Sequence, residues 1–201
     1  MNVRLEYSMS WTAGMWFDQQ LQMNNYTIKL SMVTNSSLQR DHAVSLARLN
    51  HFVYHELANT TFIHHDNTAQ MQALSQAGIK ITPLPEDPID QIIGIALYCK
   101  LNAILQNKTI VTALKIQSDL GDHVCYLHND QESLGPFAQS GWWQDAGPIH
   151  SNYRIANKKK DVVKLDRSVT WQSMNLDWAV DEPMDTTNNT VVFAKFSPDE
   201  N

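Results

Sequence analysis

Apolar side chains occupy every second position over residues 3–11 and again over residues 26–32. A period of two places one set of side chains on the buried face of a sheet and the other set in water. We therefore predict two strands that pair antiparallel, with Asn24 and Asn25 in a turn before the second strand. The segment 15–23 fits either a strand or a short helix.

A helical spacing replaces this alternation further along the chain. Leu46, Leu49, Val53 and Leu57 recur at intervals of three or four residues. This stripe predicts an amphipathic helix over residues 38–57, with Ser36 or Ser37 as its cap.

The longest apolar run covers residues 87–106. Asp87 is a good helix cap and Pro88 suits a first helical position, so the start of a helix is well marked. Its apolar residues cover more than one face, and such a helix must be enclosed by other elements. Polar residues interrupt the run, which excludes a membrane span of about 20 apolar residues. We predict the central buried helix here.

Two shorter units complete the expected fold. Residues 60–82 read as strand, helix and strand, a βαβ-like unit with parallel strands. Two apolar runs within residues 110–128 flank a loop that contains Gly121, which predicts a hairpin. The fold class is therefore α+β: one domain over residues 1–201, with a mixed, mostly antiparallel sheet covered by the helices 38–57 and 87–106.

The segment 129–152 has a different character. It contains three glycines, two prolines and the aromatic residues Phe137, Trp142 and Trp143. Long loops are usually functional or disordered, and adjacent tryptophans argue against disorder. The segment is either a lid that closes the core or a surface for a partner, and in the second case we expect at least one tryptophan to be exposed.

The composition and net charge of the chain disfavour some classes of function. The chain has 201 residues, a formal net charge of −6 and 43% hydrophobic residues, which is ordinary for a folded globular protein. The negative charge disfavours a protein that binds nucleic acid by broad neutralisation of phosphates, except locally at Lys158, Lys159 and Lys160. Residues 177–201 form an acidic C-terminal segment.

Only two cysteines occur, Cys99 and Cys125. Both have apolar neighbours, and we expect buried, reduced thiols that react slowly. The sequence shows no secretory signal or membrane span, so a soluble, cytoplasmic protein is expected.

Histidines supply one candidate site. His51 and His55 lie four residues apart on one helical face, and His64, His65 and Asp66 follow the helix. Two such imidazoles suit a Zn or Mn site with one of the later residues as a third ligand, and in a strand His64 and His65 would point to opposite faces. The alternative is that the histidines are amphipathic surface residues without a metal.

The loop 118–123 supplies a second candidate. Its sequence, SDLGDH, places carboxylates beside a histidine, an arrangement that general acid–base catalysis can use, although a polar hairpin loop has the same composition. The sequence contains no P-loop, dinucleotide-binding or nucleophile-elbow motif.

Two hypotheses about function follow. The favoured one is a small accessory protein without enzymatic activity, of the kind that phages encode, which binds a protein partner through Phe137, Trp142 and Trp143. The alternative is a metal-dependent hydrolase or nuclease that uses His51, His55 and one of His64, His65 or Asp66.

Overall fold

A long β-hairpin is the centre of the fold, and the computed structural model describes residues 4–129, 135–148 and 169–179. Strand β1 (Arg4–Phe17) pairs antiparallel with β2 (Gln20–Thr34) over their whole length. The turn between them is Asp18–Gln19, and both residues have positive φ, 47° and 59°. Two left-handed residues give the tight turn whose twist matches paired strands. The ambiguous segment 15–23 is therefore the tip of this hairpin.

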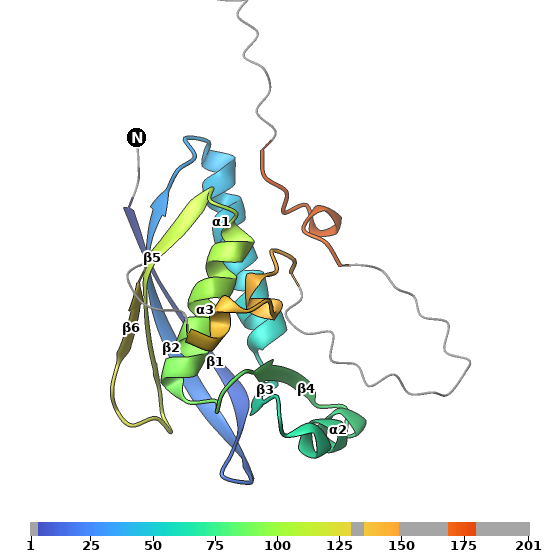
Figure 1. Ribbon diagram of the computed structural model, residues 1–201. Helices are drawn as coiled ribbons and strands as arrows, with labels where there is room; N and C mark the ends of the chain where they lie inside the picture. Colours follow the sequence, from blue (N-terminus) through green and yellow to red (C-terminus); the bar gives the residue numbers. More distant parts are fainter. Residues whose placement is uncertain (1–3, 130–134, 149–168, 180–201) are drawn as a thin grey trace, which may run out of the picture.

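Four further strands extend the hairpin into a mixed sheet with the order β4-β3-β1-β2-β5-β6 (Figure 1). On one side, β5 (Thr109–Ser118) and β6 (Tyr126–Asn129) add antiparallel. On the other side, β3 (Thr60–His64) and β4 (Lys80–Leu84) add parallel, joined by α2 (Thr68–Gln76). The predicted βαβ-like unit and the predicted 110–128 hairpin are both confirmed.

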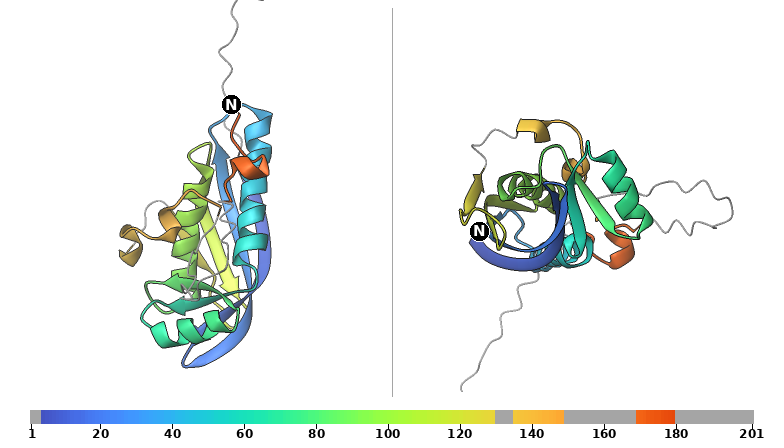
Figure 2. Two further views of the ribbon diagram at one scale, coloured as in Figure 1. Left: turned by 90° about the vertical axis from the view of Figure 1, so that its right-hand side faces the viewer. Right: turned by 90° about the horizontal axis from the view of Figure 1, so that it is seen from below.

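Two helical segments pack on the same face of the sheet (Figures 1 and 2). The first is α1 (Gln39–His51), which continues as a π-helical turn, η1 (Phe52–Leu57). The second is α3 (Asp90–Leu105). These elements correspond to the predicted helices 38–57 and 87–106, and the predicted α+β fold with a mixed sheet is confirmed.

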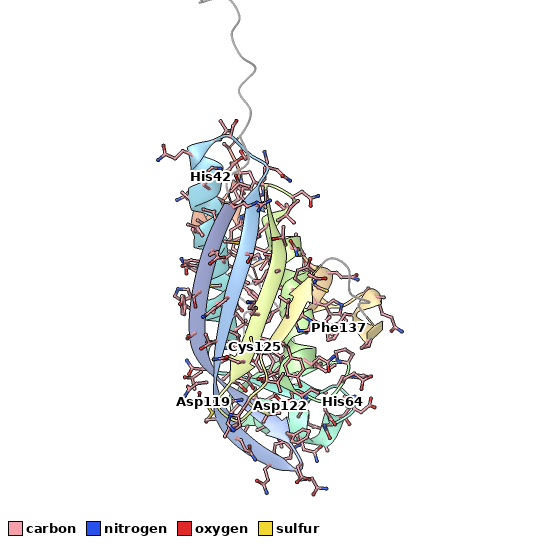
Figure 3. All side chains as sticks on the ribbon, turned by 90° about the vertical axis from the view of Figure 1, so that its left-hand side faces the viewer. His42, His64, Asp119, Asp122, Cys125 and Phe137 are labelled. Carbon is pink, nitrogen blue, oxygen red and sulfur yellow. The ribbon has the colours of Figure 1, made fainter. Side chains whose placement is uncertain are left out.

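The core lies between these helices and the sheet. From α3, Ile93, Leu97 and Leu101 are fully buried, and from β2 Tyr26 and Ile28 meet them. The alternate residues of the strands face outward, and most of them are polar. Figure 3 views this outer face of the sheet. The alternation read from the sequence thus sets which face of the sheet is buried.

Two buried cations hold later segments against the helices. Arg48 is 2% exposed, and its guanidinium lies 4.8 Å from the ring of Trp171 and 4.0 Å from that of Trp178. It donates to the carbonyl oxygens of Leu176 (2.8 Å) and Ile104 (3.0 Å). Burial lowers its pKa to about 10, so the side chain is still charged at neutral pH. Arg48 therefore joins residues 169–179 to α1 and α3.

Lys100 does the same for the aromatic segment. It is fully buried on α3, and its ammonium donates to the backbone carbonyls of Asp145 (2.6 Å) and Gly147 (3.1 Å). Burial lowers its pKa to about 8, against the opposing charges of Asp145 and Glu56. In the sequence, Lys100 only interrupts an apolar run. In the structure, it holds a loop that lies more than 40 residues further along the chain.

Some local predictions are wrong. The helix α3 begins at Asp90 after Ile89, so neither Asp87 nor Pro88 marks its start. Asn24 and Asn25 lie inside β2, because the period of two continues unbroken through both residues. None of the helices in the described part of the chain is long and apolar enough to cross a membrane.

The two cysteines differ in exposure. Cys99 is half-buried on α3, whereas Cys125 is exposed in the connection that precedes β6. The expectation that both are buried is therefore wrong for Cys125, because β6 begins one residue later. Burial raises the pKa of the Cys99 thiol to about 11.

We expect a thiol reagent at neutral pH to modify Cys125 rapidly and Cys99 slowly, because the thiolate is the reactive species and burial disfavours it. The measurement is the mass of tryptic peptides after timed labelling of the native protein. Equal rates at the two positions would show that α3 does not shield Cys99.

Candidate functional site

A pocket of about 170 Å³ opens where three parts of the fold meet. These parts are the far end of the β1–β2 hairpin, the start of α3 and the connection between β5 and β6. The lining residues are Met15, Phe17, Asn24, Ile89, Asp90, Ser118, Leu120, Gly121, Asp122 and Tyr126. Most of this wall is apolar, and the polar groups come from a few side chains, which is the usual composition of a small-molecule site.

Asp90 is the chemically distinctive residue of this pocket. Its side chain is 7% exposed, and the Ser118 hydroxyl donates to its Oδ1 at 2.7 Å. Its second oxygen, Oδ2, has no hydrogen-bond partner among the described residues. Buried polar atoms almost always have a partner, so an unpaired carboxylate oxygen in a pocket needs an explanation.

The surroundings of Asp90 disfavour its negative charge. Burial raises the pKa of its carboxyl group, the hydroxyl and the backbone N–H of Ser118 oppose this rise, and the charge of Asp122 adds to it. Asp122 itself is exposed, and the hydroxyl of Tyr126 donates to it at 2.5 Å, which lowers the pKa of Asp122. The pocket therefore holds two acidic groups and none of its lining residues is basic.

Asn24 contributes a second unsatisfied group. Its Oδ1 accepts the backbone N–H of Leu120 at 3.0 Å, while its Nδ2 is buried without a partner among the described residues. Tyr26, on the same face of β2, is fully buried and burial raises the pKa of its hydroxyl. The side chain of Asn24 opposes this rise, so its amide lies beside the Tyr26 hydroxyl, and the acceptor that the pocket offers is the carboxyl group of Asp90.

The β5–β6 connection closes over this acceptor. A Cβ atom on Gly121 would lie 2.6 Å from Oδ2 of Asp90, so a larger residue at this position would require the carboxylate to shift. Asp119, in the same connection, accepts from Asn25 of β2 at 2.8 Å. The predicted acidic loop 118–123 therefore forms one wall of the pocket, and Figure 3 shows Asp119 and Asp122 at the hairpin end of the molecule.

The aromatic residues of the candidate partner surface pack inward. Phe137 is fully buried and Trp143 is 8% exposed, with its indole N–H donating to Phe137 O at 3.0 Å. Trp142 is half-buried, and its indole N–H donates to Pro83 O at 2.8 Å. The expectation of an exposed tryptophan is therefore wrong, because this segment folds against α3 and Lys100 holds its backbone.

The histidines do not assemble as one site. The rings of His51 and His55 lie 5.2 Å apart, and burial lowers the pKa of His51. In the described part of the chain, the group of three metal-donor side chains is instead His64, His65 and Asp66. The predicted metal residues therefore separate into a pair on the first helical segment and a turn after β3.

Several sequence candidates lie outside the described residues. They are the three lysines at 158–160 and all but the first three residues of the acidic segment 177–201.

The sequence identified only part of the pocket. It indicated the loop 118–123 but did not indicate Asp90, Asn24 or Tyr126. The available signal was a carboxylate at the start of a helix otherwise rich in apolar residues, and by itself it suggests only a helix terminus.

No protein-family model matches the chain, and no curated protein matches its sequence. An uncharacterised protein from Wolinella succinogenes has a similar structure, with a TM-score of 0.48 and 10% identity over 65% of this chain and 99% of that one. A catalytic-residue mutant of 6-pyruvoyltetrahydropterin synthase from Plasmodium vivax gives a TM-score of 0.40 and 10% identity over 64% of this chain and 99% of that one. Similarity at this level says nothing about function, which must be argued from the pocket.

Proposed function

We propose that this protein binds a small, flat, positively charged molecule in the pocket around Asp90. The observation that carries the proposal is the unpaired, buried Oδ2 of Asp90 in a mostly apolar pocket. A buried acceptor without a partner costs about 1–3 kcal/mol, and more when it is charged. A ligand N–H group that donates to Oδ2 recovers this free energy on binding.

The size of the pocket limits the ligand. A cavity of about 150 Å³ is known to hold one benzene molecule. The pocket here is about 170 Å³, and its walls include the rings of Phe17 and Tyr126. A single substituted ring therefore fits, with any larger portion left outside the pocket.

The charge of the pocket favours a cation. Asp90 and Asp122 are the carboxylic acids in the lining, and the charge of Asp122 raises the pKa of the Asp90 carboxyl group. A bound cation relieves this repulsion, whereas a bound anion adds to it. Phe17, Ile89 and Leu120 are exposed at the pocket and offer apolar surface to the rest of a ligand.

The hypothesis of a protein partner at Phe137, Trp142 and Trp143 stays a prediction. These rings already contact the core, and their indole N–H groups already have acceptors. A partner at this segment would have to displace contacts that the isolated chain already makes. The pocket requires no such rearrangement, so small-molecule binding is the better-supported function.

Benzamidine is a suitable probe, because it combines one flat ring with a cationic pair of N–H donors. We expect calorimetry at neutral pH to show binding at one site, and no binding of benzoate, which has the same size and the opposite charge. Equal binding of the two probes, or of neither, would contradict the proposed recognition by Asp90.

A further inference from the structure

The turn after β3 brings three metal-donor side chains together. Strand β3 ends at His64, and His65 and Asp66 form the turn before Asn67 and α2. We expected His64 and His65 to point to opposite faces of a strand, but His65 lies beyond the end of β3. The rings of His64 and His65 therefore lie on the same side, with their centroids 4.8 Å apart. The donor atoms of all three residues lie within 4.8 Å of one another.

The end of β4 fixes this turn. The backbone N–H of His65 donates to Leu84 O at 2.8 Å, and the Nδ1 atom of His65 lies 3.1 Å from the same oxygen. A carbonyl oxygen only accepts hydrogen bonds, so Nδ1 of His65 carries a proton. The lone pair of the neutral ring is therefore on Nε2. Such a bond from one ring nitrogen to a backbone carbonyl is what orients histidines in metal sites.

The resulting lone pairs face a carboxylate. Nε2 of His65 lies 3.1 Å from Oδ1 of Asp66. Nδ1 of His64 accepts the backbone N–H of Asp66 at 3.3 Å, so it is also an acceptor, and it lies 3.9 Å from Oδ2 of Asp66. On the neutral ring of His65, Nε2 and the Asp66 carboxylate are thus two acceptors 3.1 Å apart, and a cation between them turns their repulsion into attraction. The lone pair of His64 joins them when it exchanges its bond to the Asp66 N–H for the cation.

We propose that His64, His65 and Asp66 bind one divalent first-row metal ion of the Zn²⁺ class. Two imidazoles and one carboxylate suit such ions, and the remaining coordination positions are open because the side chains of His65 and Asp66 are 55% and 75% exposed. Around Zn²⁺ at about 2.0–2.1 Å, donor atoms are roughly 3.3 Å apart. The donor atoms reach this spacing when the exposed side chains of His65 and Asp66 rotate toward His64, whose own side chain is 21% exposed.

This site is independent of the Asp90 pocket and differs from the metal site predicted around His51 and His55. His51 is half-buried against Trp171, whose ring centroid lies 5.9 Å from its own. His55 is exposed one turn later. A substitution of His55 therefore separates the two possibilities.

Calorimetric titration of the untagged full chain with ZnCl₂ tests the proposal. We expect one equivalent of Zn²⁺ to bind, and we expect affinity to fall at least tenfold in both His65→Gln and Asp66→Asn. The His65→Gln variant keeps an N–H donor near Leu84 O, and Asp66→Asn is isosteric, so both variants are expected to keep the fold. Melting curves without metal check this.

Two control variants, His55→Ala and His42→Ala, are expected to bind Zn²⁺ like the parent chain, and Figure 3 shows His42 at the opposite end of the molecule from His64. Loss of Zn²⁺ binding in His55→Ala with retention in His65→Gln and Asp66→Asn would overturn the proposal in favour of the helical pair. Absence of Zn²⁺ binding to the parent chain at millimolar metal would overturn it altogether.

Discussion

Replacing Arg48 with alanine is expected to lower the free energy of unfolding by about 3 kcal/mol or more. The side chain is buried and donates to two backbone carbonyls, Leu176 O and Ile104 O. Each buried acceptor that loses its donor costs about 1–3 kcal/mol, and the contacts with the rings of Trp171 and Trp178 are lost as well.

Urea denaturation of the parent and the variant measures this change. Arg40→Ala is the matched control, because Arg40 lies on the same helix and is exposed. We expect the control to change stability by less than about 0.5 kcal/mol. We also expect proteolysis between residues 169 and 179 to accelerate in Arg48→Ala alone. A similar small effect in both variants would mean that Arg48 does not fasten this segment.

Replacing Asp90 with asparagine is expected to weaken benzamidine binding by tenfold or more. The substitution keeps the shape of the side chain and removes the negative charge, and a hydrogen bond to a charged group contributes about 1.5–3 kcal/mol. Asp87→Asn is the matched control, since Asp87 is exposed three residues earlier and the change in net charge is the same. Unchanged affinity in Asp90→Asn would remove Asp90 from the site.

The same substitution should stabilise the free protein at neutral pH by about 1 kcal/mol. The pKa of Asp90 is raised in the folded state, so the folded chain holds this proton more tightly than the unfolded chain. Below the ordinary pKa of 3.8, Asp90 is protonated in both states and its ionisation costs no stability. As pH rises from 3.8 through the raised pKa of the folded state, ionisation of Asp90 lowers the free energy of unfolding. The stability advantage of Asp90→Asn should accordingly be present at pH 7 and vanish at strongly acidic pH.

Much of the fold follows from local periodicity. The alternation that begins near Leu5 and the apolar run that includes Leu97 identify a half-buried strand and a buried helix, because each period matches one backbone geometry. The hairpin tip escaped prediction because Asp18 and Gln19 adopt left-handed backbone angles without a glycine. Aspartate is common in turns, but the strong hairpin signal pairs it with glycine, and no glycine follows Asp18.

The pocket follows from tertiary structure and not from any local pattern. Asn24, Asp90 and Ser118 come from three different elements, β2, α3 and β5, and the nearest two, Asp90 and Ser118, are 28 residues apart in the sequence. Their meeting depends on the register of β2 against β5, where Tyr26 pairs with Ser118. The strand register cannot be read from one sequence. The acidic loop 118–123 could therefore be identified as a candidate, but its proximity to Asp90 could not.

The burial of Trp142 and Trp143 was also not predicted, because it too depends on a tertiary contact. Adjacent tryptophans in a glycine- and proline-rich stretch suit either a lid or an exposed surface, and the residue that decides between them is Lys100. Its ammonium binds the backbone of the segment from inside the core. Lysine is rarely buried, so the sequence predicts an exposed position for it.

The pKa of the Asp90 carboxyl group is the most direct test of the proposed function. Carbon-13 NMR of the side-chain carboxyl carbons, recorded across a pH titration with and without saturating benzamidine, measures it. We expect a pKa above the ordinary 3.8 in the free protein, and a fall in that pKa when benzamidine is bound. A pKa at or below 3.8 in the free protein that benzamidine leaves unchanged would contradict a binding site built on Asp90.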